Sequence, residues 1–319
     1  MKRASFAKIA APLAGLGLGL ACLGSVTLNF NILLGNILGG LAALVLGIYL
    51  SKIVMNFSAF KQDLKHPVFS SIVPTFSMGM MIIATYLGRI NYEVGRIVWL
   101  VAVVLHGLLL ISFLSNILRD FNFQNIVPSY FIPPVGIVVA CISGGMFNFP
   151  ILCETIFYFG FISYIITLIL VLINLAMGNI PSPKKPTLAI LAAPASLYLA
   201  GCLSLNSVMN PLFIYILVPL SIATTIAVYV MFFKLLRIPF SPGYSAYTFP
   251  LAISAVAMLK LARYLNNSRI GWASYVELFA MIELYIAVLI MFYVGIRYLH
   301  FYLAPHKNEN INEKQRSQD

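Results

Sequence analysis

The chain has 319 residues, of which 61% are hydrophobic and 9% are charged, and its formal net charge is +11. A soluble domain of this composition would expose a very large apolar surface, so the mean hydropathy of +0.95 excludes the soluble globular classes. The basic residues are spread over short connections instead of one face, which argues against nucleic-acid binding. We predict an all-α polytopic membrane protein.

Ten apolar runs follow one another along the chain, and at about 20 residues each is long enough to cross a bilayer as a helix. The predicted spans are 6–27, 31–55, 67–87, 94–115, 128–147, 151–174, 186–206, 209–233, 242–265 and 273–297. We expect one ten-helix transport domain over residues 1–305. The polar residues 306–319 are expected to form a disordered cytoplasmic tail.

Prolines recur inside the odd-numbered spans at intervals of about 60 residues. They are Pro12, Pro74, Pro134, Pro194 and Pro250. A proline removes a backbone hydrogen bond and kinks a helix, and the freed backbone groups are tolerated in a membrane only where they face protein or water. We therefore predict five helical-hairpin repeats, with the kinked odd-numbered helices in an inner pore ring and the even-numbered helices in an outer ring.

Lys and Arg residues in the connections predict the orientation, since most of them lie on the same side as the N terminus. That side is expected to be cytoplasmic, and because ten is an even number of spans, both termini are then cytoplasmic. We expect the protein to lie in the plasma membrane. The start of the chain also has the basic and apolar pattern of a signal peptide. Pro12 is in phase with the other four prolines, which favours a span.

The position before each proline suggests a gate. In chain order it is occupied by Ala11, Val73, Pro133, Ala193 and Phe249, so a single aromatic ring stands among compact neighbours. If these positions face the axis, the Phe249 ring closes the pore as a hydrophobic gate. The alternative is that Phe249 packs between helices like the other phenylalanines. Thr75 and Thr248, beside these positions, are further candidates for the pore lining.

Charged residues favour anions. The predicted inner spans contain no Asp or Glu, whereas a cation pathway would ordinarily carry carboxylates. Lys260 lies three helical turns after Phe249, and with Arg263 it would attract anions to the outer mouth, unless both side chains only extend to the membrane interface. His106 and Glu283, on outer helices, are possible coupling groups, although each is better explained by a local partner between helices.

Cysteine spacing gives no metal site. Cys22, Cys141, Cys153 and Cys202 fall within or at the edge of spans, without C-x-x-C or Cys/His ligand spacing. We expect neither metal nor cofactor. Enzyme motifs such as H-E-x-x-H and G-x-S-x-G are also missing from the sequence, so we do not expect an enzyme.

Three segments resemble a known family. LKHPVFSSIVPTFSMGMM around Pro67 and Pro74, PSYFIPPVGIVVA from Pro128, and AYTFPLA around Phe249 are similar to the tellurite-resistance/dicarboxylate transporter family, which includes tellurite-resistance protein A and the slow-type anion channels of plants. The resemblance covers about residues 5–300. It implies a homotrimer in which each protomer has its own pore, and a phenylalanine that blocks the pore at the position matching Phe249.

Two kinds of transport stay open at this point. A gated channel would pass small inorganic anions, with Phe249 moving aside. A proton-coupled carrier or exporter would move C4-dicarboxylate, sulfite or tellurite-like oxyanions. In both cases the expected partners are small inorganic or organic anions and the lipid bilayer.

Overall fold

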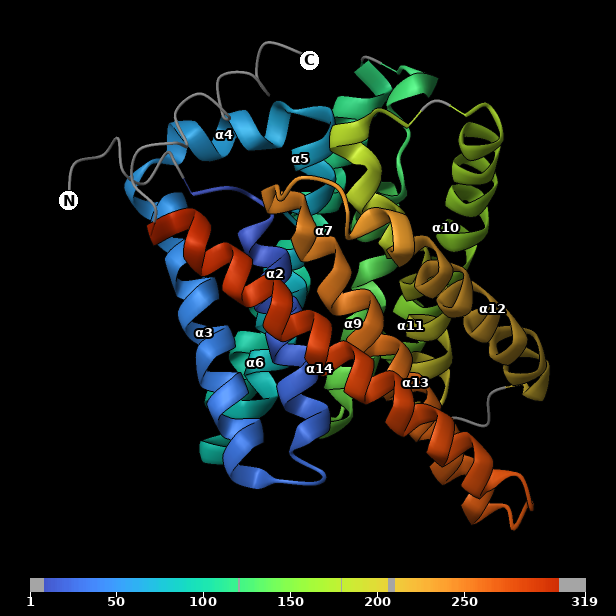
Figure 1. Cartoon of the computed structure of the whole chain (residues 1–319). Helices are drawn as coiled ribbons and strands as arrows, with labels where there is room; N and C mark the ends of the chain where they lie inside the picture. The colour runs from blue at the N-terminus through green and yellow to red at the C-terminus, as the bar shows by residue number, and fades with distance from the viewer. Residues whose placement is uncertain (1–8, 120, 179, 206–209, 304–319) are drawn as a thin grey trace.

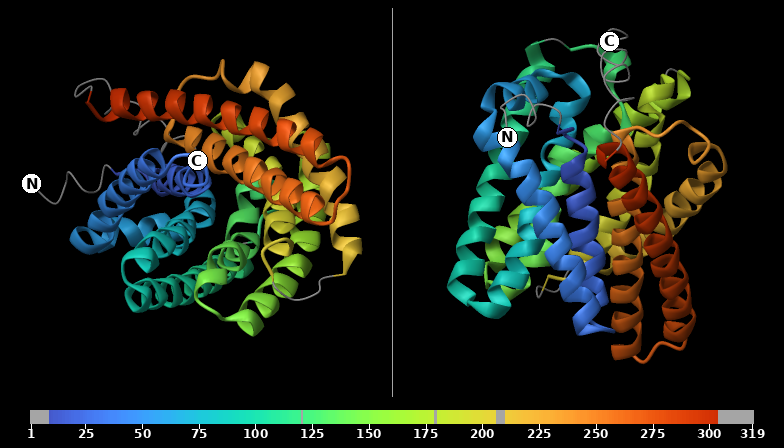
Figure 2. Two further views of the ribbon diagram at one scale, coloured as in Figure 1. Left: turned by 90° about the horizontal axis from the view of Figure 1, so that it is seen from below. Right: turned by 60° about the vertical axis from the view of Figure 1, so that its left-hand side comes forward.

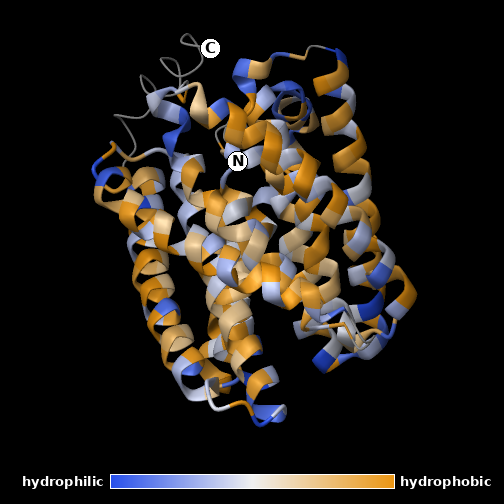
Figure 3. Cartoon of the chain, turned by 90° about the vertical axis from the view of Figure 1, so that its right-hand side faces the viewer, coloured by the Kyte–Doolittle hydropathy of each residue, from blue (hydrophilic) through white to orange (hydrophobic). Residues whose placement is uncertain are grey.

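The computed structural model describes residues 9–119, 121–178, 180–205 and 210–303, and all regular secondary structure within them is helical. The long continuous helices are α3 (Ile32–Met55), α7 (Tyr92–Arg119), α10 (Pro150–Ala176), α12 (Pro211–Leu235) and α14 (Ala273–Leu303). Their sequences are long apolar runs, and their outward faces expose many Leu and Ile side chains. Hydrophobic residues cover the middle of the bundle and polar residues gather at both ends, as expected for a protein that spans a bilayer (Figure 3).

The proline-bearing segments are buried; the first two are α-helical, and the other three combine 3₁₀ and α-helical pieces. The first is α2 (Leu13–Thr27), and the second is α5 (Pro67–Ile72) followed by α6 (Thr75–Ile90). The last two pair a 3₁₀ segment with an α-helix: η5 (Ser182–Ala192) with α11 (Ala193–Cys202), and η6 (Pro242–Tyr247) with α13 (Thr248–Asn267). Since proline has no N–H to donate, these two segments change type near their prolines.

The third segment is the most interrupted. Pro133 and Pro134 both lie in it, and it consists of five short pieces. The pieces are η2 (Pro128–Phe131), α8 (Ile132–Val135), η3 (Gly136–Val138), α9 (Val139–Ser143) and η4 (Gly144–Met146).

Within the described residues, eight helical segments are long and apolar enough to cross a membrane. They include all five long helices and three of the proline-bearing segments, Pro67–Ile90, Pro128–Met146 and Pro242–Asn267. α2 is apolar but has only 15 residues, and residues 182–202 combine a 3₁₀ start with a ten-residue α-helix. A polytopic all-helical membrane protein is thereby confirmed, while the ten-span repeat stays a prediction. The tail at 306–319 lies outside the described residues.

The buried helices contact one another in a closed circuit. α2 packs against α6, α6 against α9, α9 against α11, α11 against α13, and α13 again against α2. Each long helix packs on the segment that precedes it in the chain, such as α3 on α2 and α14 on α13 (Figure 1). Seen from below, the chain runs round the bundle from blue through green to orange (Figure 2). The proline-bearing segments therefore surround the centre of the molecule.

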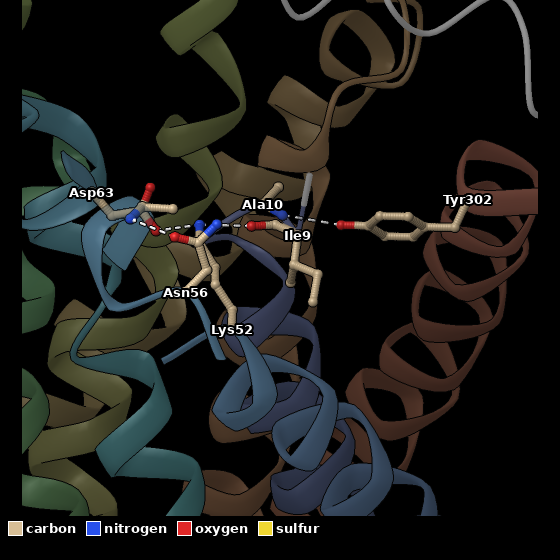
Figure 4. Close-up of polar contacts among 7 residues, drawn as sticks. Ile9, Ala10, Lys52, Asn56, Asp63 and Tyr302 are labelled. Atoms are coloured by element: carbon tan, nitrogen blue, oxygen red, sulfur yellow. Dashed lines mark hydrogen bonds and ion pairs between the residues drawn. The ribbon is translucent and has the colours of Figure 1, made fainter. Parts of the chain in front are cut away.

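Polar contacts join the first and last described segments at one end of the bundle. The Ala10 N–H donates to the Tyr302 hydroxyl of α14 at 3.2 Å. The ammonium of Lys52, on α3, donates to the Ile9 carbonyl at 2.7 Å and pairs with Asp63 at 2.5 Å (Figure 4). Asp63 belongs to α4 (Phe57–Lys65), a short helix that the sequence analysis did not predict. This cluster ties the beginning of the ring to its end.

Candidate functional site

A cavity with about 660 Å³ of empty volume lies at the centre of the ring. Its wall includes residues of all five proline-bearing segments, represented by Leu18, Met78, Val135, Leu197 and Phe249. This central cavity is therefore built by the same segments that form the closed circuit.

A second cavity, with about 430 Å³ of empty volume, follows along the ring axis. Its wall uses later residues of four of these segments, all but η5–α11. Ser25 of α2, Thr85 of α6 and Ser143 of α9 lie in it, whereas earlier residues of these segments line the central cavity. On α13 its wall includes Ile253 and Val256. We call this space the outer cavity, since the predicted topology places it toward the outside.

Phe249 lines both cavities. Its side chain is 7% exposed, and along α13 it precedes the outer-cavity residues Ile253 and Val256. The ring therefore stands between the two spaces. The residues around this aromatic ring are mostly apolar.

The other predicted lining residues divide into two groups. Thr75 and Ala193 line the central cavity, while Ala11, Val73, Pro133 and Thr248 line neither cavity. Among the kink prolines, Pro194 and Pro250 line the central cavity, and Pro12, Pro74 and Pro134 do not. The prediction treated the position before each proline as equivalent. The segments differ in helix type near the proline, so equivalent sequence positions point in different directions.

Side chains of the non-lining candidates pack between helices. The Pro133 carbonyl lies 2.8 Å from His106 Nε2 and accepts its hydrogen bond. The Thr248 hydroxyl donates to the Ser245 carbonyl at 2.7 Å, and it approaches α2 so closely that a Cβ on Gly19 would lie 2.3 Å from its oxygen. These residues hold the ring together instead of facing its centre.

The central cavity is neutral. None of the described residues in its wall is charged, and two of its three hydroxyl-bearing residues, Thr75 and Thr187, donate to carbonyls of their own segments, while Ser245 is the third. Thr75 donates to the Ile72 carbonyl at 2.8 Å, and Thr187 donates to the Lys184 carbonyl at 2.7 Å. The electrostatic contribution at this depth comes from the backbone, since α6 begins at Thr75, in the wall, after the interruption at Pro74. α11 instead continues η5 directly, and the Ala193 N–H donates to the Ile190 carbonyl. The N-terminal end of a helix carries partial positive charge, which favours anions.

Lys260 and Arg263 lie toward the C-terminal end of α13. Lys260 is half-buried and follows Val256 of the outer cavity by about one helical turn, whereas Arg263 is exposed. The helical periodicity that placed Lys260 on the same face as Phe249 also places Ile253 and Val256 on that face, four and seven residues after Phe249. These two residues were missed, although the same helical periodicity identifies them.

His106 and Glu283 lie outside both cavities. His106 is fully buried on α7, with Nδ1 2.9 Å from the Ser77 hydroxyl of α6 and Nε2 at the Pro133 carbonyl. Glu283 is fully buried on α14, with Ser254 as its hydrogen-bond partner. Each residue thus has the local partner that its position between helices suggested.

A helical membrane bundle with aligned internal cavities is the architecture of a membrane transport protein. The family model described as voltage-dependent anion channel matches residues 10–296, and the chain belongs to that family. The resemblance to the tellurite-resistance/dicarboxylate transporter family is thereby confirmed.

Two relatives come from Methanocaldococcus jannaschii, and both are named as uncharacterized transporters. One is 28% identical over 222 residues, covering 60% of this chain and 64% of the relative. The other is 26% identical over 270 residues, covering 73% of this chain and 76% of the relative. The chain thus aligns with less than two thirds of the length of the first relative.

Proposed function

We propose that this protein conducts small anions across the plasma membrane through a pore within each protomer, and that Phe249 is the gate. The observation that carries the proposal is the position of the Phe249 ring in the walls of both cavities. If the ring moves aside, the two cavities join into one passage. Membership in the anion channel family supports anions as the conducted species.

The proposed pore is a ring of five hairpins, with ten spans in total. The closed circuit of contacts among the proline-bearing segments supports this arrangement. The N-terminus of α6 at Thr75 supplies positive potential at the depth of the central cavity, and Lys260 and Arg263 attract anions to the outer mouth. We propose cytoplasmic termini, from the distribution of Lys and Arg over the connections, and a homotrimer, as the family resemblance implies.

A channel is favoured over a coupled carrier by the neutral wall. A carrier for C4-dicarboxylates or other oxyanions needs fixed donors or cations that recognise its substrate. In the described wall of the central cavity, the hydroxyls of Thr75 and Thr187 are bonded to their own segments. Small monovalent anions require no such groups, since helix N-termini and pore diameter suffice.

Substitution of the gate tests the proposal. Phe249→Ala in proteoliposomes is expected to increase chloride and nitrate flux, about tenfold for each 1.4 kcal/mol removed from the barrier. Phe232→Ala is the matched control, because Phe232 is a similarly buried phenylalanine that lines neither cavity. Unchanged flux in a normally assembled Phe249→Ala protein would contradict the gate. Proton-dependent uptake without unitary conductance would instead identify a carrier.

A further inference from the structure

The buried carboxyl group of Glu283 is the centre of a polar site outside the pore. Its side chain is 0% exposed, and both carboxyl oxygens lie 2.9 Å from the Ser254 hydroxyl of α13. The Ser254 oxygen in turn lies 2.9 Å from the Thr225 hydroxyl of α12. Three helices thus meet in one hydrogen-bonded chain of a carboxyl group and two hydroxyl groups.

No basic side chain among the described residues forms an ion pair with Glu283. Of the neighbouring elements, α12 contributes Thr225 and also carries Tyr229, whose hydroxyl is buried without a hydrogen-bond partner. α2 also packs against α14, and it has no Asp, Glu, Lys, Arg or His. A carboxylate in such surroundings is costly when ionised, so it is most stable with a bound proton.

The remaining titratable groups on the elements around Glu283 are either hydrogen-bonded to other residues or far from its carboxyl group. In η6, which also packs on α14, the hydroxyls of Tyr244 and Tyr247 donate to carbonyls of residues 238 and 235. Lys260 of α13 lies six residues beyond Ser254, about 9 Å along the helix, and Arg263 lies farther still.

We propose that Glu283, Ser254 and Thr225 form a proton-binding site whose occupancy controls the position of the gate helix α13. When Glu283 holds the proton, its hydroxyl donates to Ser254, and Ser254 donates to Thr225. When the proton leaves to water, Ser254 donates to the carboxylate and Thr225 donates to Ser254. The direction of the hydrogen-bonded chain therefore reverses with each protonation change.

The link to the gate rests on the proposed function. Ser254 lies five residues after Phe249 and directly beside Ile253, which lines the outer cavity. An ionised Glu283 favours hydration of the contact between α12, α13 and α14, which loosens the helix that carries Phe249. The expected consequence is an anion flux that increases with pH, measured with equal pH on both sides of the membrane.

The proton itself is detected without any transport measurement. Infrared difference spectroscopy of the purified protein, titrated over about pH 5 to 8, is expected to show the C=O band of a buried protonated carboxyl group. Glu283→Gln removes this band, and Ser254→Ala shifts it. Glu277→Gln is the matched control, because Glu277 is an exposed glutamate on the same helix and its substitution leaves the band in place. A band that survives Glu283→Gln would overturn the site.

Flux then tests the link to the gate. Over the same range of about pH 5 to 8, wild-type flux is expected to increase severalfold, while Glu283→Gln keeps the low flux of the protonated form. Equal pH dependence in both proteins would overturn control of the gate. A Phe249→Ala protein with unchanged flux would contradict the gate alone, since the infrared band does not depend on transport.

Discussion

Single side chains donate to backbone carbonyl groups of the proline-bearing segments, in addition to the backbone bond that the Pro74 carbonyl accepts from the Met78 N–H at 3.1 Å. His106 binds the Pro133 carbonyl, and Ser77 donates to the Pro74 carbonyl at 2.8 Å. Ser196 of α11 donates at 2.9 Å to the carbonyl of Ala192, which is the last residue of η5. In a membrane an unpaired backbone carbonyl has no water to bind, so these contacts stabilise the interrupted segments.

Replacement of His106 by leucine is expected to destabilise the protein. Leucine is of similar size but leaves the Pro133 carbonyl and the Ser77 hydroxyl without this partner, at a cost of about 2 kcal/mol. Thermal unfolding in detergent measures the effect. His300→Leu is the control, because His300 is exposed at the end of α14. Equal melting temperatures for the two variants would show that the His106 contacts contribute little.

Replacement of Lys52 by methionine is expected to cost about 2 kcal/mol of stability, since it removes the partner of a largely buried carboxylate and of the Ile9 carbonyl. Lys65→Met, at an exposed position on α4, should leave the melting temperature unchanged. The prediction fails if Lys52→Met unfolds at the wild-type temperature.

At the scale of elements, glycine permits close contact between α3 and α6. A Cβ on Gly39 would lie 2.4 Å from the Tyr86 ring, and a Cβ on Gly24 of α2 would lie 3.0 Å from the Gly39 nitrogen. The three helices can therefore approach each other only because these positions carry no side chain.

The neighbouring glycines of α3 provide a matched pair. Gly39→Ala is expected to destabilise the protein by about 1–3 kcal/mol, because the added methyl group displaces Tyr86. Gly40→Ala meets nothing within 4 Å and should be neutral or slightly stabilising. Melting temperatures of both variants, measured in the same detergent, decide the matter, and a similar loss for both would contradict the packing argument.

The sequence predicted the long helices well because each is a continuous apolar run. α3 and α10 begin and end close to the predicted residues, whereas α14 extends past residue 297 to Leu303. The short α4 was missed, although its alternation of Phe57 and Phe60 with charged residues is typical of an interfacial helix. Helix type in the buried segments was not predictable, since contacts across the ring replace the local hydrogen bonds.

The same limit applies to the candidate site. Phe249, Thr75 and Ala193 were found from their position near a proline, and they line the central cavity. The direction in which the side chain of Val73 or Thr248 projects from the helix axis depends on how many residues of each segment are 3₁₀ and how many are α-helical. A side chain turns by about 120° per residue in one and 100° in the other, so a short 3₁₀ stretch changes which residues face inward.

At the scale of the whole molecule, the closed circuit of segments supports the proposal that one chain forms a complete passage. In the proposed trimer each protomer would then conduct independently. Linked protomers that carry one, two or three copies of Phe249→Ala are expected to increase anion flux in equal steps. A steep rise only with the third copy would indicate a single passage shared among protomers.

The contact that closes the ring, between the first and the last proline-bearing segments, has a consequence for biosynthesis. Gly15 and Thr248, whose backbone carbonyl and hydroxyl meet at 3.4 Å, are separated by 233 residues. During translation, the first proline-bearing segment must therefore wait in the membrane until nearly the whole polypeptide has emerged. The apolar and uncharged α2 is suited to that delay, since lipid can solvate it before α13 arrives. Until α13 is inserted, the ring of proline-bearing segments has a gap that lipid fills. Incomplete chains therefore have no passage through which ions could leak.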